Sequence, residues 1–419
     1  MEKRSAVLFC SLVELLFLLS CSMGNNAIGR LNLSLHPNQT IGIQQLLGHE
    51  TCDLKVHIRD ADIIEYNLES NSLNAKRVGT TVITLSYSLA TQLQSTVVDI
   101  RVIPNIAAGS DSLLIFGRNL LISYDDSQKT DYTKVLGVHS KFDAPAEFCV
   151  WTYQIDDSSK EKLNKNELLT LATTNGNEIV SHSIYHIALA GGTLLTTSPK
   201  GTDVVHTNVD SNFTWGKFRT FDIRRKDNTF ELVNVRGVEI EKNGNTKIRL
   251  AEPLQREYPA GSTLEMTDES IEKEAYESRE WLRQSGIECQ GFSYPFGRVD
   301  YRSEQIIKQY YTTARIASPI KADRSNIYDS IYQDIVPNRF EINALDFSQL
   351  TDEEIVSILK KPQNDNFLIV LFSHSYDKNC TDGKIEFLIS EAQKLGITIT
   401  TRTRLIYGQQ DDNNKTHDN

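Results

Sequence analysis

Two adjacent carboxylates, Asp125 and Asp126, end an apolar run that spans Asn119–Tyr124. Two like charges at the end of a buried strand are costly unless a cation lies beside them. His182 and His186 are spaced i, i+4, so they would lie on one face of a helix or helical turn and could share a cation. With Asp126 they form a ligand set that leaves positions open for water and substrate, as a catalytic metal site requires. Asp125 could then take a proton from a water molecule.

A third histidine, His374, follows another apolar run, Phe367–Phe372, near the end of the chain. Each piece alone has a plainer interpretation, in which the aspartates cap a helix or turn and the histidines lie on the surface. The order of the pieces favours a shared site. All of them follow strand-like runs, and the carboxyl ends of parallel strands in a barrel meet at one face, where active sites lie.

The elements that must position these residues alternate between strand and helix from about residue 112 onward. This alternation predicts a parallel sheet, and the number of units predicts a distorted, closed or nearly closed (β/α) barrel. The predicted strands are 121–124, 146–153, 178–181, 291–294, 312–317, 367–372 and 397–400, and the predicted helices are 160–173, 269–284, 302–310, 351–359 and 384–395. A β-rich stretch with Asn and Gly turns, 213–267, interrupts the alternation and is predicted to be an insertion in the barrel.

A different pattern precedes the barrel, over residues 30–104. Short alternating runs such as Thr81–Tyr87 and β-branched runs such as Thr96–Ile103 predict an all-β sandwich. The stretch Ala75-Lys76-Arg77-Val78-Gly79-Thr80-Thr81-Val82-Ile83 resembles the signature of bacterial Ig-like group 2 modules. The resemblance implies an Ig-like domain, a type of module that serves mostly as a spacer or an adhesive unit.

The N-terminus is typical of a bacterial secretion signal. Lys3 and Arg4 precede a mostly apolar stretch that ends in Leu18-Leu19-Ser20-Cys21, which resembles a lipobox. We therefore expect residues 1–21 to be a lipoprotein-type signal peptide with Cys21 as the lipidated residue, residues 22–29 to be a tether, and the polar residues 409–419 to be a disordered tail. An ordinary cleaved signal or an uncleaved membrane anchor is the alternative.

The bulk composition limits the partners. The chain of 419 residues has a net charge of -11, with 39% hydrophobic and 24% charged residues. Such a charge disfavours nucleic acid as a partner. The four cysteines after Cys21 form no CxxC pair, which argues against a disulfide framework or a Cys-based zinc site.

The segment Asn119–His374 resembles the polysaccharide deacetylase catalytic domain (NodB-homology, carbohydrate esterase family four). Four motifs in order carry the resemblance: Ser123-Tyr124-Asp125-Asp126-Ser127, then Gly176-Asn177-Glu178-Ile179-Val180-Ser181-His182-Ser183-Ile184-Tyr185-His186, then Phe292-Ser293-Tyr294-Pro295-Phe296-Gly297, and finally Leu368-Ile369-Val370-Leu371-Phe372-Ser373-His374. With the domains above, it implies a barrel over residues 112–408.

The resemblance implies a role for each matching position. Asp125 would be the catalytic base, Asp126, His182 and His186 the metal ligands, and His374 the general acid for the leaving amine. Tyr294 and Pro295 would form a wall at which a backbone N–H helps to hold the oxyanion.

The sequence departs from the family at Ser293, where an Arg commonly steadies the catalytic base. Arg339, on a later predicted strand, is our candidate for that role, and a surface position is the alternative. Tyr185 and Trp215 could stack on sugar rings, or could be packing residues.

The resemblance implies a hydrolase that removes acetyl groups, most readily N-acetyl groups, from a polysaccharide or peptidoglycan at the cell envelope. The cofactor would be a divalent metal, Zn²⁺ first, with Co²⁺, Mn²⁺ or Ni²⁺ as alternatives, and the lipid anchor would hold the exported protein on a membrane. Two other functions remain open: an O-acetyl esterase acting on plant-type glycans, and a catalytically silent glycan-binding or adhesion lipoprotein.

Overall fold

The computed structural model describes residues 28–89, 92–157, 161–209, 220–242 and 244–408. The predicted signal peptide with Cys21, Trp215 and the predicted tail lie outside these residues, as does most of the predicted tether. The chain divides into two compact units between Asn105 and Ile106, and Tyr407 and Gly408 belong to the first unit. None of the described helices is both long and apolar enough to span a membrane.

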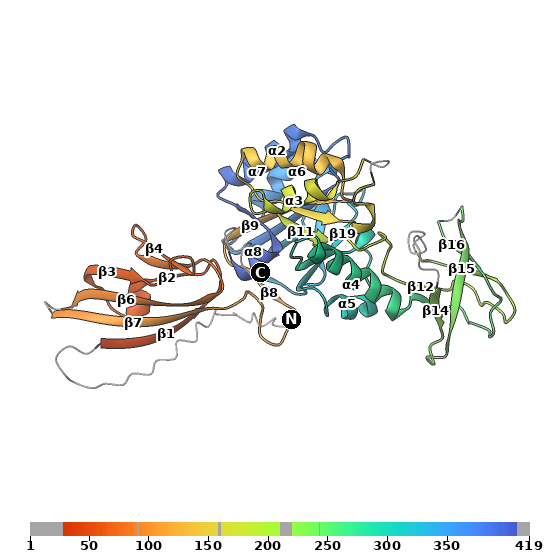
Figure 1. Ribbon diagram of the computed structural model, residues 1–419, viewed down its shortest axis with the longest axis horizontal. Coiled ribbons are helices and arrows are strands. Elements are labelled where there is room, and N and C mark those ends of the chain that lie inside the picture. Colours follow the sequence, from red (N-terminus) through yellow and green to blue (C-terminus); the bar gives the residue numbers. More distant parts are fainter. Residues whose placement is uncertain (1–27, 90–91, 158–160, 210–219, 243, 409–419) are drawn as a thin grey trace, which may run out of the picture. The chain divides into compact units, whose positions relative to one another are not determined.

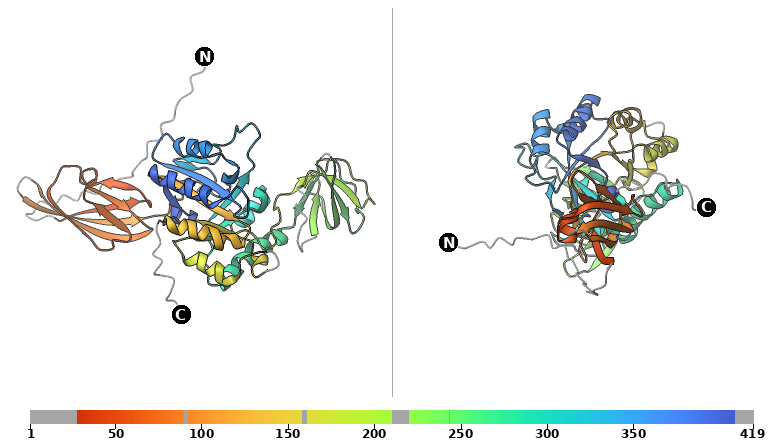
Figure 2. Two further views of the ribbon diagram at one scale, coloured as in Figure 1. Left: turned by 90° about the horizontal axis from the view of Figure 1, so that it is seen from above. Right: turned by 90° about the vertical axis from the view of Figure 1, so that its left-hand side faces the viewer.

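The first unit is built from two sheets around one apolar core (Figure 2). One sheet has the order β1-β7-β6-β3 and the other β2-β5-β4. The elements are β1 (Ile28–Leu35), β2 (Thr40–Gly42), α1 (Ile43–Leu47), β3 (Cys52–Ile58), β4 (Ile64–Asn67), β5 (Ser72–Ala75), β6 (Gly79–Leu89) and β7 (Gln92–Val102). Alternate residues of β6 and β7 are buried, as their period-two pattern predicts. The all-β architecture agrees with the sequence pattern, and the Ig-like classification stays a prediction.

The second unit contains a closed barrel of seven parallel strands among its described residues (Figure 1). The barrel strands, in order, are β9 (Arg118–Asp125), β10 (Glu147–Val150), β11 (Glu178–Ser181), β18 (Gly291–Ser293), β19 (Thr313–Ser318), β22 (Ile342–Asp346) and β23 (Phe367–Ser373). The last of these strands, β23, pairs with β9 along its own whole length and closes the barrel. The predicted parallel barrel is thus observed.

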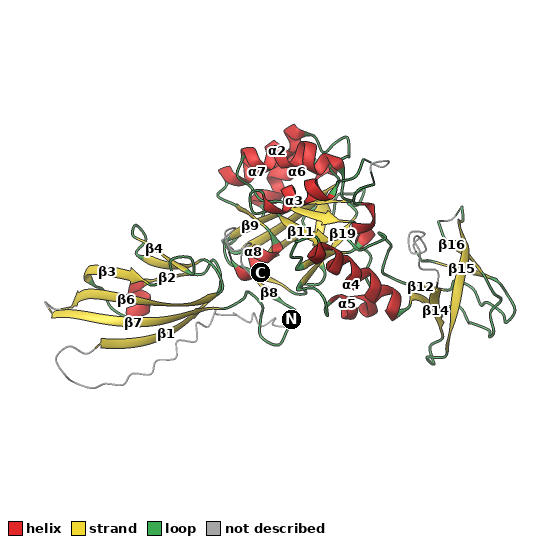
Figure 3. Ribbon diagram, in the orientation of Figure 1, coloured by secondary structure: helices red, strands yellow, loops and turns green. Residues whose placement is uncertain are grey.

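Helices lie outside these strands (Figure 3). They are α2 (Leu136–Lys141), which follows a π-helical turn at Asp131–Val135, α3 (Lys165–Thr173), α4 (Asp268–Gln284), α5 (Tyr301–Ile307), α6 (Asp352–Lys360), α7 (Asp382–Lys394) and α8 (Arg402–Tyr407). Side-chain caps fix several helix starts. Asn164 and Thr351 form capping boxes with the residues three positions later, Glu167 and Glu354. This explains why α3 begins at Lys165 and not at residue 160 as predicted.

Short strands complete the second unit. β24 (Thr398–Thr400) lies beside β9, β20 (Ile331–Gln333) is antiparallel to β23, and β8 (Leu113–Leu114) pairs with β21 (Ile335–Val336).

A separate antiparallel sheet of six described strands follows β11 in the chain. Its order is β12-β17-β14-β15-β16-β13. The strands are β12 (Gly192–Thr193), β13 (Val204–Thr207), β14 (Thr220–Arg224), β15 (Phe230–Ile240), β16 (Thr246–Leu250) and β17 (Thr263–Met266). The β-rich segment therefore begins at Gly192, earlier than the predicted residue 213, because β12 and β13 are too short to give a periodic signal.

The barrel interior carries a buried ion pair as well as apolar side chains. Arg402 donates from Nε to Oε2 of Glu147 at 2.9 Å, and both residues are fully buried. The same guanidinium donates to the carbonyl of Phe292 at 2.7 Å and to Oγ of Ser293 at 3.2 Å. A buried charge needs such a full set of partners. The network holds β18 from inside the barrel.

Candidate active site

The two aspartates lie where β9 ends. Asp125 is the last residue of the strand, and Asp126 and Ser127 turn the chain away with left-handed φ values of 81° and 53°. This conformation is unfavourable for residues other than glycine, and such strain is concentrated at functional sites. The hydroxyl of Ser127 helps to hold the turn by accepting the backbone N–H of Trp151 at 2.7 Å.

The two histidines lie on a loop that directly follows β11. Ser181 ends the strand, and the backbone N–H of His182 still donates to Val150 on β10, at 2.8 Å. The predicted helical turn is wrong, because Ser183 and His186 have left-handed φ values of 65° and 53°. The hydroxyl of Ser183 accepts the N–H of His186 at 3.0 Å, which folds the loop back on itself.

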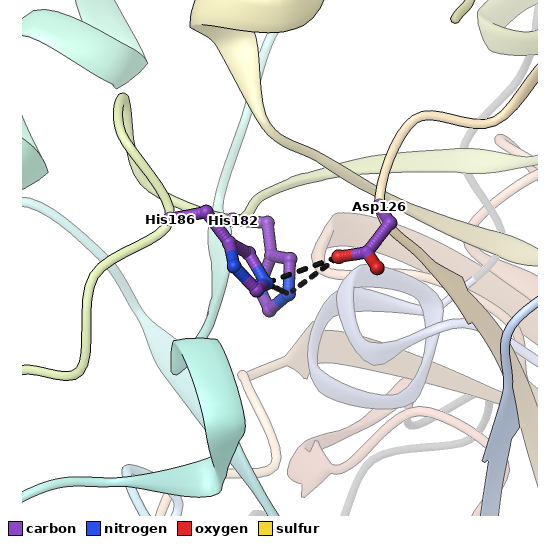
Figure 4. A group of neighbouring side chains, drawn as sticks. All are labelled: Asp126, His182 and His186. Carbon is purple, nitrogen blue, oxygen red and sulfur yellow. Dashed lines mark hydrogen bonds and ion pairs between the residues drawn. The ribbon is translucent and has the colours of Figure 1, made fainter. Parts of the chain in front are cut away.

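The loop brings both imidazoles to Asp126 (Figure 4). Nε2 of His186 lies 3.0 Å and Nε2 of His182 lies 3.7 Å from Oδ1 of Asp126, and the two nitrogens are 3.1 Å apart. Nδ1 of His182 is 2.7 Å from the carbonyl of Ser293, so this nitrogen carries the proton and Nε2 keeps its lone pair. Burial lowers the pKa of His182 to about 4, which leaves the ring neutral at physiological pH.

These three side chains fit a divalent metal. Two nitrogens bound to a tetrahedral zinc at ~2.0–2.1 Å lie about 3.3 Å apart, close to the observed Nε2 separation. All three donor atoms lie within 4.8 Å of one another. Two neutral imidazoles and one carboxylate form a donor set that suits zinc and other first-row divalent ions, and it leaves coordination positions for water and substrate.

Asp125 is held by a cation that was not among the predicted site residues. Nη2 of Arg315, on β19, lies 2.5 Å and 2.7 Å from the two carboxylate oxygens, and both side chains are buried. Burial alone would raise the pKa of Asp125, but the charge and hydrogen bonds of Arg315 outweigh it and hold the pKa below its usual value. The guanidinium also lies 4.8 Å above the ring of Phe372.

The prediction that Arg339 supports Asp125 is therefore wrong. Arg339 lies before β22, and its Nε donates to the carbonyl of Thr312 at 2.9 Å while its Nη1 donates to the carbonyl of Ser110 at 3.1 Å. Thr312 immediately precedes β19, so these contacts are at the amino ends of the barrel strands. Asp125 is at the carboxyl end of β9, where Arg339 cannot reach it.

His374 faces Oδ2 of Asp126, the carboxylate oxygen that the two ligand histidines do not face. Its Nε2 lies 3.7 Å from Oδ2, whereas the two ligand histidines face Oδ1. Tyr376 donates its hydroxyl to the same Oδ2 at 3.3 Å, and its ring lies 5.4 Å from that of His374. His374 therefore lies beside the candidate metal site but faces a different oxygen of Asp126 from the two ligand histidines.

Tyr294 and Pro295 are buried and do not form the predicted wall. The N–H of Tyr294 donates to the carbonyl of Arg315 at 2.9 Å, and proline has no N–H, so neither residue can donate to an oxyanion. The next residue, Phe296, is different. It has a left-handed φ of 58°, its side chain is 41% exposed, and its ring lies 4.6 Å from that of His186.

Aromatic rings surround the histidine loop. The rings of Trp151 and Phe296 both contact the imidazole of His186, Trp151 at 4.9 Å in a tilted arrangement and Phe296 at 4.6 Å edge to face. Tyr153 and Tyr185 form a further pair at 5.0 Å, and Tyr153 is 54% exposed. The prediction for Tyr185 as a sugar-stacking residue thus remains open, and the rings of Trp151, Phe296 and Tyr376 join it as candidates.

Sequence reasoning missed Arg315, Tyr376, Trp151 and Phe296 as site residues. Arg315 did carry a signal, because a single arginine inside the strand Thr313–Ser318 must either face solvent or pair with a buried carboxylate. Tyr376 follows His374 by two residues, but nothing in its neighbours indicates that it turns back towards Asp126.

Residues 117–314 match the family model described as polysaccharide deacetylase, which covers just under half of the chain. The matched stretch contains Asp125, Asp126, His182, His186 and the first two residues of β19. No curated protein is similar enough to the chain to count as a relative.

Solved structures of several deacetylases are similar to the chain at low identity. The family 4 carbohydrate esterase from Streptomyces lividans in complex with acetate is 10% identical over 70% of this chain and 98% of that one, with a TM-score of 0.37. The chitin deacetylase from the fungal pathogen Colletotrichum lindemuthianum is 12% identical over 73% and 96%, with a TM-score of 0.40. The chain spans only 62% of the Streptococcus pyogenes deacetylase PplD in complex with acetate, at 12% identity over 53% of this chain and a TM-score of 0.29.

Proposed function

We propose that the protein is a metal-dependent deacetylase that hydrolyses acetyl groups, N-acetyl groups above all, of a polysaccharide or peptidoglycan at the cell envelope. One observation carries the proposal. Asp126, His182 and His186 converge at one end of a barrel that matches the polysaccharide deacetylase family model, beside Asp125 and His374. Amide hydrolysis needs an activated water, a stabilised oxyanion and a proton for the leaving amine, and these side chains would serve the first and the last of these requirements.

Asp126, His182 and His186 would hold the metal, most readily Zn²⁺. When bound, it would supply a Lewis acid for the substrate carbonyl and lower the pKa of a nearby water. Asp125 would accept the proton of the attacking water, and Arg315 would keep its carboxylate ionised and fixed in direction. His374, on the Oδ2 side of Asp126, would donate a proton to the departing nitrogen.

The oxyanion would be held by the backbone N–H of Phe296. The amides of the two preceding residues are excluded by the contacts given above, and the exposed ring of Phe296 beside His186 supports a position at the site. A preorganised backbone donor at this point is worth ~3 kcal/mol in comparable hydrolases.

The aromatic rings support a sugar polymer as the substrate. Aromatic faces pack well against the C–H faces of pyranose rings. Tyr153, Phe296 and Tyr376 are each more than 40% exposed, and ring contacts connect Phe296 to His186 and Tyr376 to His374, so these faces would be accessible to a sugar at the site.

We also propose that the protein is exported and anchored through lipid on Cys21. The support is the sequence of residues 1–21 alone. Replacing Cys21 with Ala should move the protein from the membrane fraction to the soluble fraction of a bacterial host, and an unchanged membrane fraction would contradict the lipid anchor.

Acetate release from a panel of acetylated glycans tests the function. The panel comprises chitin oligomers, peptidoglycan and acetylated xylan, each with and without a chelator. Release from chitin oligomers or peptidoglycan that stops with the chelator supports the proposal. Release from acetylated xylan alone would indicate an O-acetyl esterase. The absence of acetate release from every substrate, by wild-type protein that retains its metal and by Asp125→Asn alike, would indicate a glycan-binding protein.

A further inference from the structure

The carboxylate of Glu274 lies completely buried beneath the loop that carries the two histidines. Its Oε2 accepts the backbone N–H of Ile184 at 2.9 Å and that of Tyr185 at 3.0 Å. Glu274 is on α4, 90 residues away in sequence from the loop. No ion pair with a lysine or arginine is found for this carboxylate among the described residues, so its burial is offset by the two N–H donors, the side chain of Ser183 and the nearby His186.

Ser278 lies one turn after Glu274 on α4 and contacts the same loop. Its hydroxyl donates to the carbonyl of Ser183 at 3.3 Å, and it is 2.7 Å from the hydroxyl of Ser181. Residues i and i+4 share a helix face, so α4 presents two polar groups to the backbone of the loop.

The loop needs such support because its own conformation is unfavourable. Ser183 and His186 both have left-handed φ values, and neither is a glycine. Both imidazoles meet at Asp126 only while these turns persist. On the opposite side, the N–H groups of Thr152 and Tyr153 donate to the carbonyls of Ser183 and Ile184, each at 3.2 Å. Without Glu274, the buried N–H of Ile184 and the partly buried N–H of Tyr185 would lack this acceptor.

We propose that Glu274 is a positioning residue for the candidate metal site, fixing the backbone between His182 and His186 so that both Nε2 atoms face Asp126. This inference rests on the proposed function. It also gives the β-rich insertion a structural connection to the site. The chain leaves the barrel after the histidine loop, forms the six-stranded sheet, and returns through α4, which begins two residues after β17.

The start of α4 is fastened to that sheet. Arg302 of α5 donates from Nη2 to Asp222 of β14 at 2.8 Å and from Nη1 to Glu265 of β17 at 3.3 Å, and its Nε bonds to Asp268 of α4. The helix α4 is therefore bonded to the six-stranded sheet at its start and, through Glu274, to the histidine loop.

The test is the affinity for Co²⁺, measured by competition with a chromophoric chelator on purified full-length protein. Glu274→Ala should raise the dissociation constant at least about tenfold, as expected when a group that orients metal ligands is lost. Glu274→Gln keeps the length and an acceptor oxygen, whereas Glu274→Asp keeps the charge but is one methylene shorter. Positioning by geometry requires the Asp variant to bind Co²⁺ more weakly than the Gln variant.

Two variants of α4 serve as matched controls. Glu277→Ala removes a glutamate that is half exposed and pairs with Lys273, and it should leave the affinity unchanged. Ile271→Val removes a buried methyl group from the same helix and should lower the melting temperature without weakening Co²⁺ binding.

The inference is overturned if Glu274→Ala binds Co²⁺ within about twofold of the wild type. It is equally overturned if Ile271→Val weakens binding as much as Glu274→Ala does, or if the Gln variant is weaker than the Asp variant. If Glu274→Ala does not fold, the comparison of Asp with Gln decides. Failure of the wild type to bind Co²⁺ or Zn²⁺ would instead refute the proposed metal site, so the two failures are distinguishable.

Discussion

Nη2 of Arg315 lies 2.5 Å from Oδ1 and 2.7 Å from Oδ2 of Asp125, across the interior from β19 to β9. Burial favours the neutral acid and the guanidinium favours the carboxylate, with a net lowering of the pKa of Asp125. A base must be ionised to accept a proton. The proposed mechanism therefore depends on Arg315 at the acid end of the pH range.

We predict that Arg315→Met raises the pKa of Asp125 and moves the acid limb of the kcat/KM profile to higher pH. The loss at neutral pH should be on the order of 100-fold, and the free energy of unfolding should fall by about 3–5 kcal/mol because a buried carboxylate loses its partner. Arg339→Met is the control. Its guanidinium contacts Thr312 and Ser110 and should leave the acid limb in place. An acid limb that stays unmoved in Arg315→Met would contradict the assignment.

Metal removal should lower stability as well as activity. Because Asp126, His182 and His186 come from two separate loops, a bound cation would tie these loops together only in the folded state. At a free metal concentration 1,000 times the dissociation constant, binding raises the free energy of unfolding by about 4 kcal/mol. We expect a chelator to lower the melting temperature and Zn²⁺ to restore it, measured by scanning calorimetry. Asp126→Ala should respond to neither, and an identical wild-type melting temperature with and without chelator would argue against the site.

A buried histidine away from the site should make the protein sensitive to acid. Nδ1 of His139 is 3.1 Å from the carbonyl of Ala144, and Nε2 is 3.0 Å from the hydroxyl of Tyr124. The carbonyl can only accept, so Nδ1 carries the proton and Nε2 accepts from Tyr124. Burial lowers the pKa of His139 from 6.5 to about 4. Between these values the unfolded chain binds the extra proton, so stability is lost as the pH falls from about 6.5 towards about 4.

Below pH 4, His139 lowers the free energy of unfolding by about 3 kcal/mol relative to neutral pH. His139→Gln keeps both hydrogen-bonding groups without a titrating ring, and we expect its free energy of unfolding to fall less steeply over this window. Urea denaturation at pH 7 and at pH 5 measures the difference. All other titrating groups are the same in the wild type and in His139→Gln, so their contributions to the pH dependence cancel in the comparison. Equal pH slopes for the two proteins would refute the role of His139.

The exposed ring of Phe296 should matter more for a polymer than for a small substrate. Phe296→Ala removes an aromatic face worth about 1 kcal/mol, which corresponds to a roughly fivefold higher KM for an acetylated glycan. A small activated ester such as nitrophenyl acetate should show little change. Phe230→Ala, at a comparably exposed ring of β15, is the control. An equal effect on both substrates would mean that Phe296 acts on His186 and not on the sugar.

The barrel could be predicted from the sequence because its strands are short, continuous apolar runs such as Phe367–Ser373, buried on every residue. The grouping of Asp126 with His182 and His186 followed from the rule that parallel strands end at one face. The support of Asp125 did not follow, since Arg315 and Asp125 are 190 residues apart and only the strand order places β19 opposite β9. The conformation of the histidine loop was also inaccessible, because side-chain contacts from Glu274 and Ser183 override the helical spacing.

The pairing of β23 with β9 has a consequence for the order of folding during synthesis. Asp125 and Asp126 leave the ribosome some 250 residues before the hydroxyl that meets Asp126. The edge of β9 that pairs with β23 has no partner until Phe367–Ser373 has been synthesised. Arg402, whose ion pair with Glu147 lies inside the barrel, is synthesised later still. A chain that stops short of these residues can have every proposed metal ligand yet no closed barrel around them. Full-length synthesis is thus a precondition for the proposed site, and partial products should be inert towards acetylated glycans.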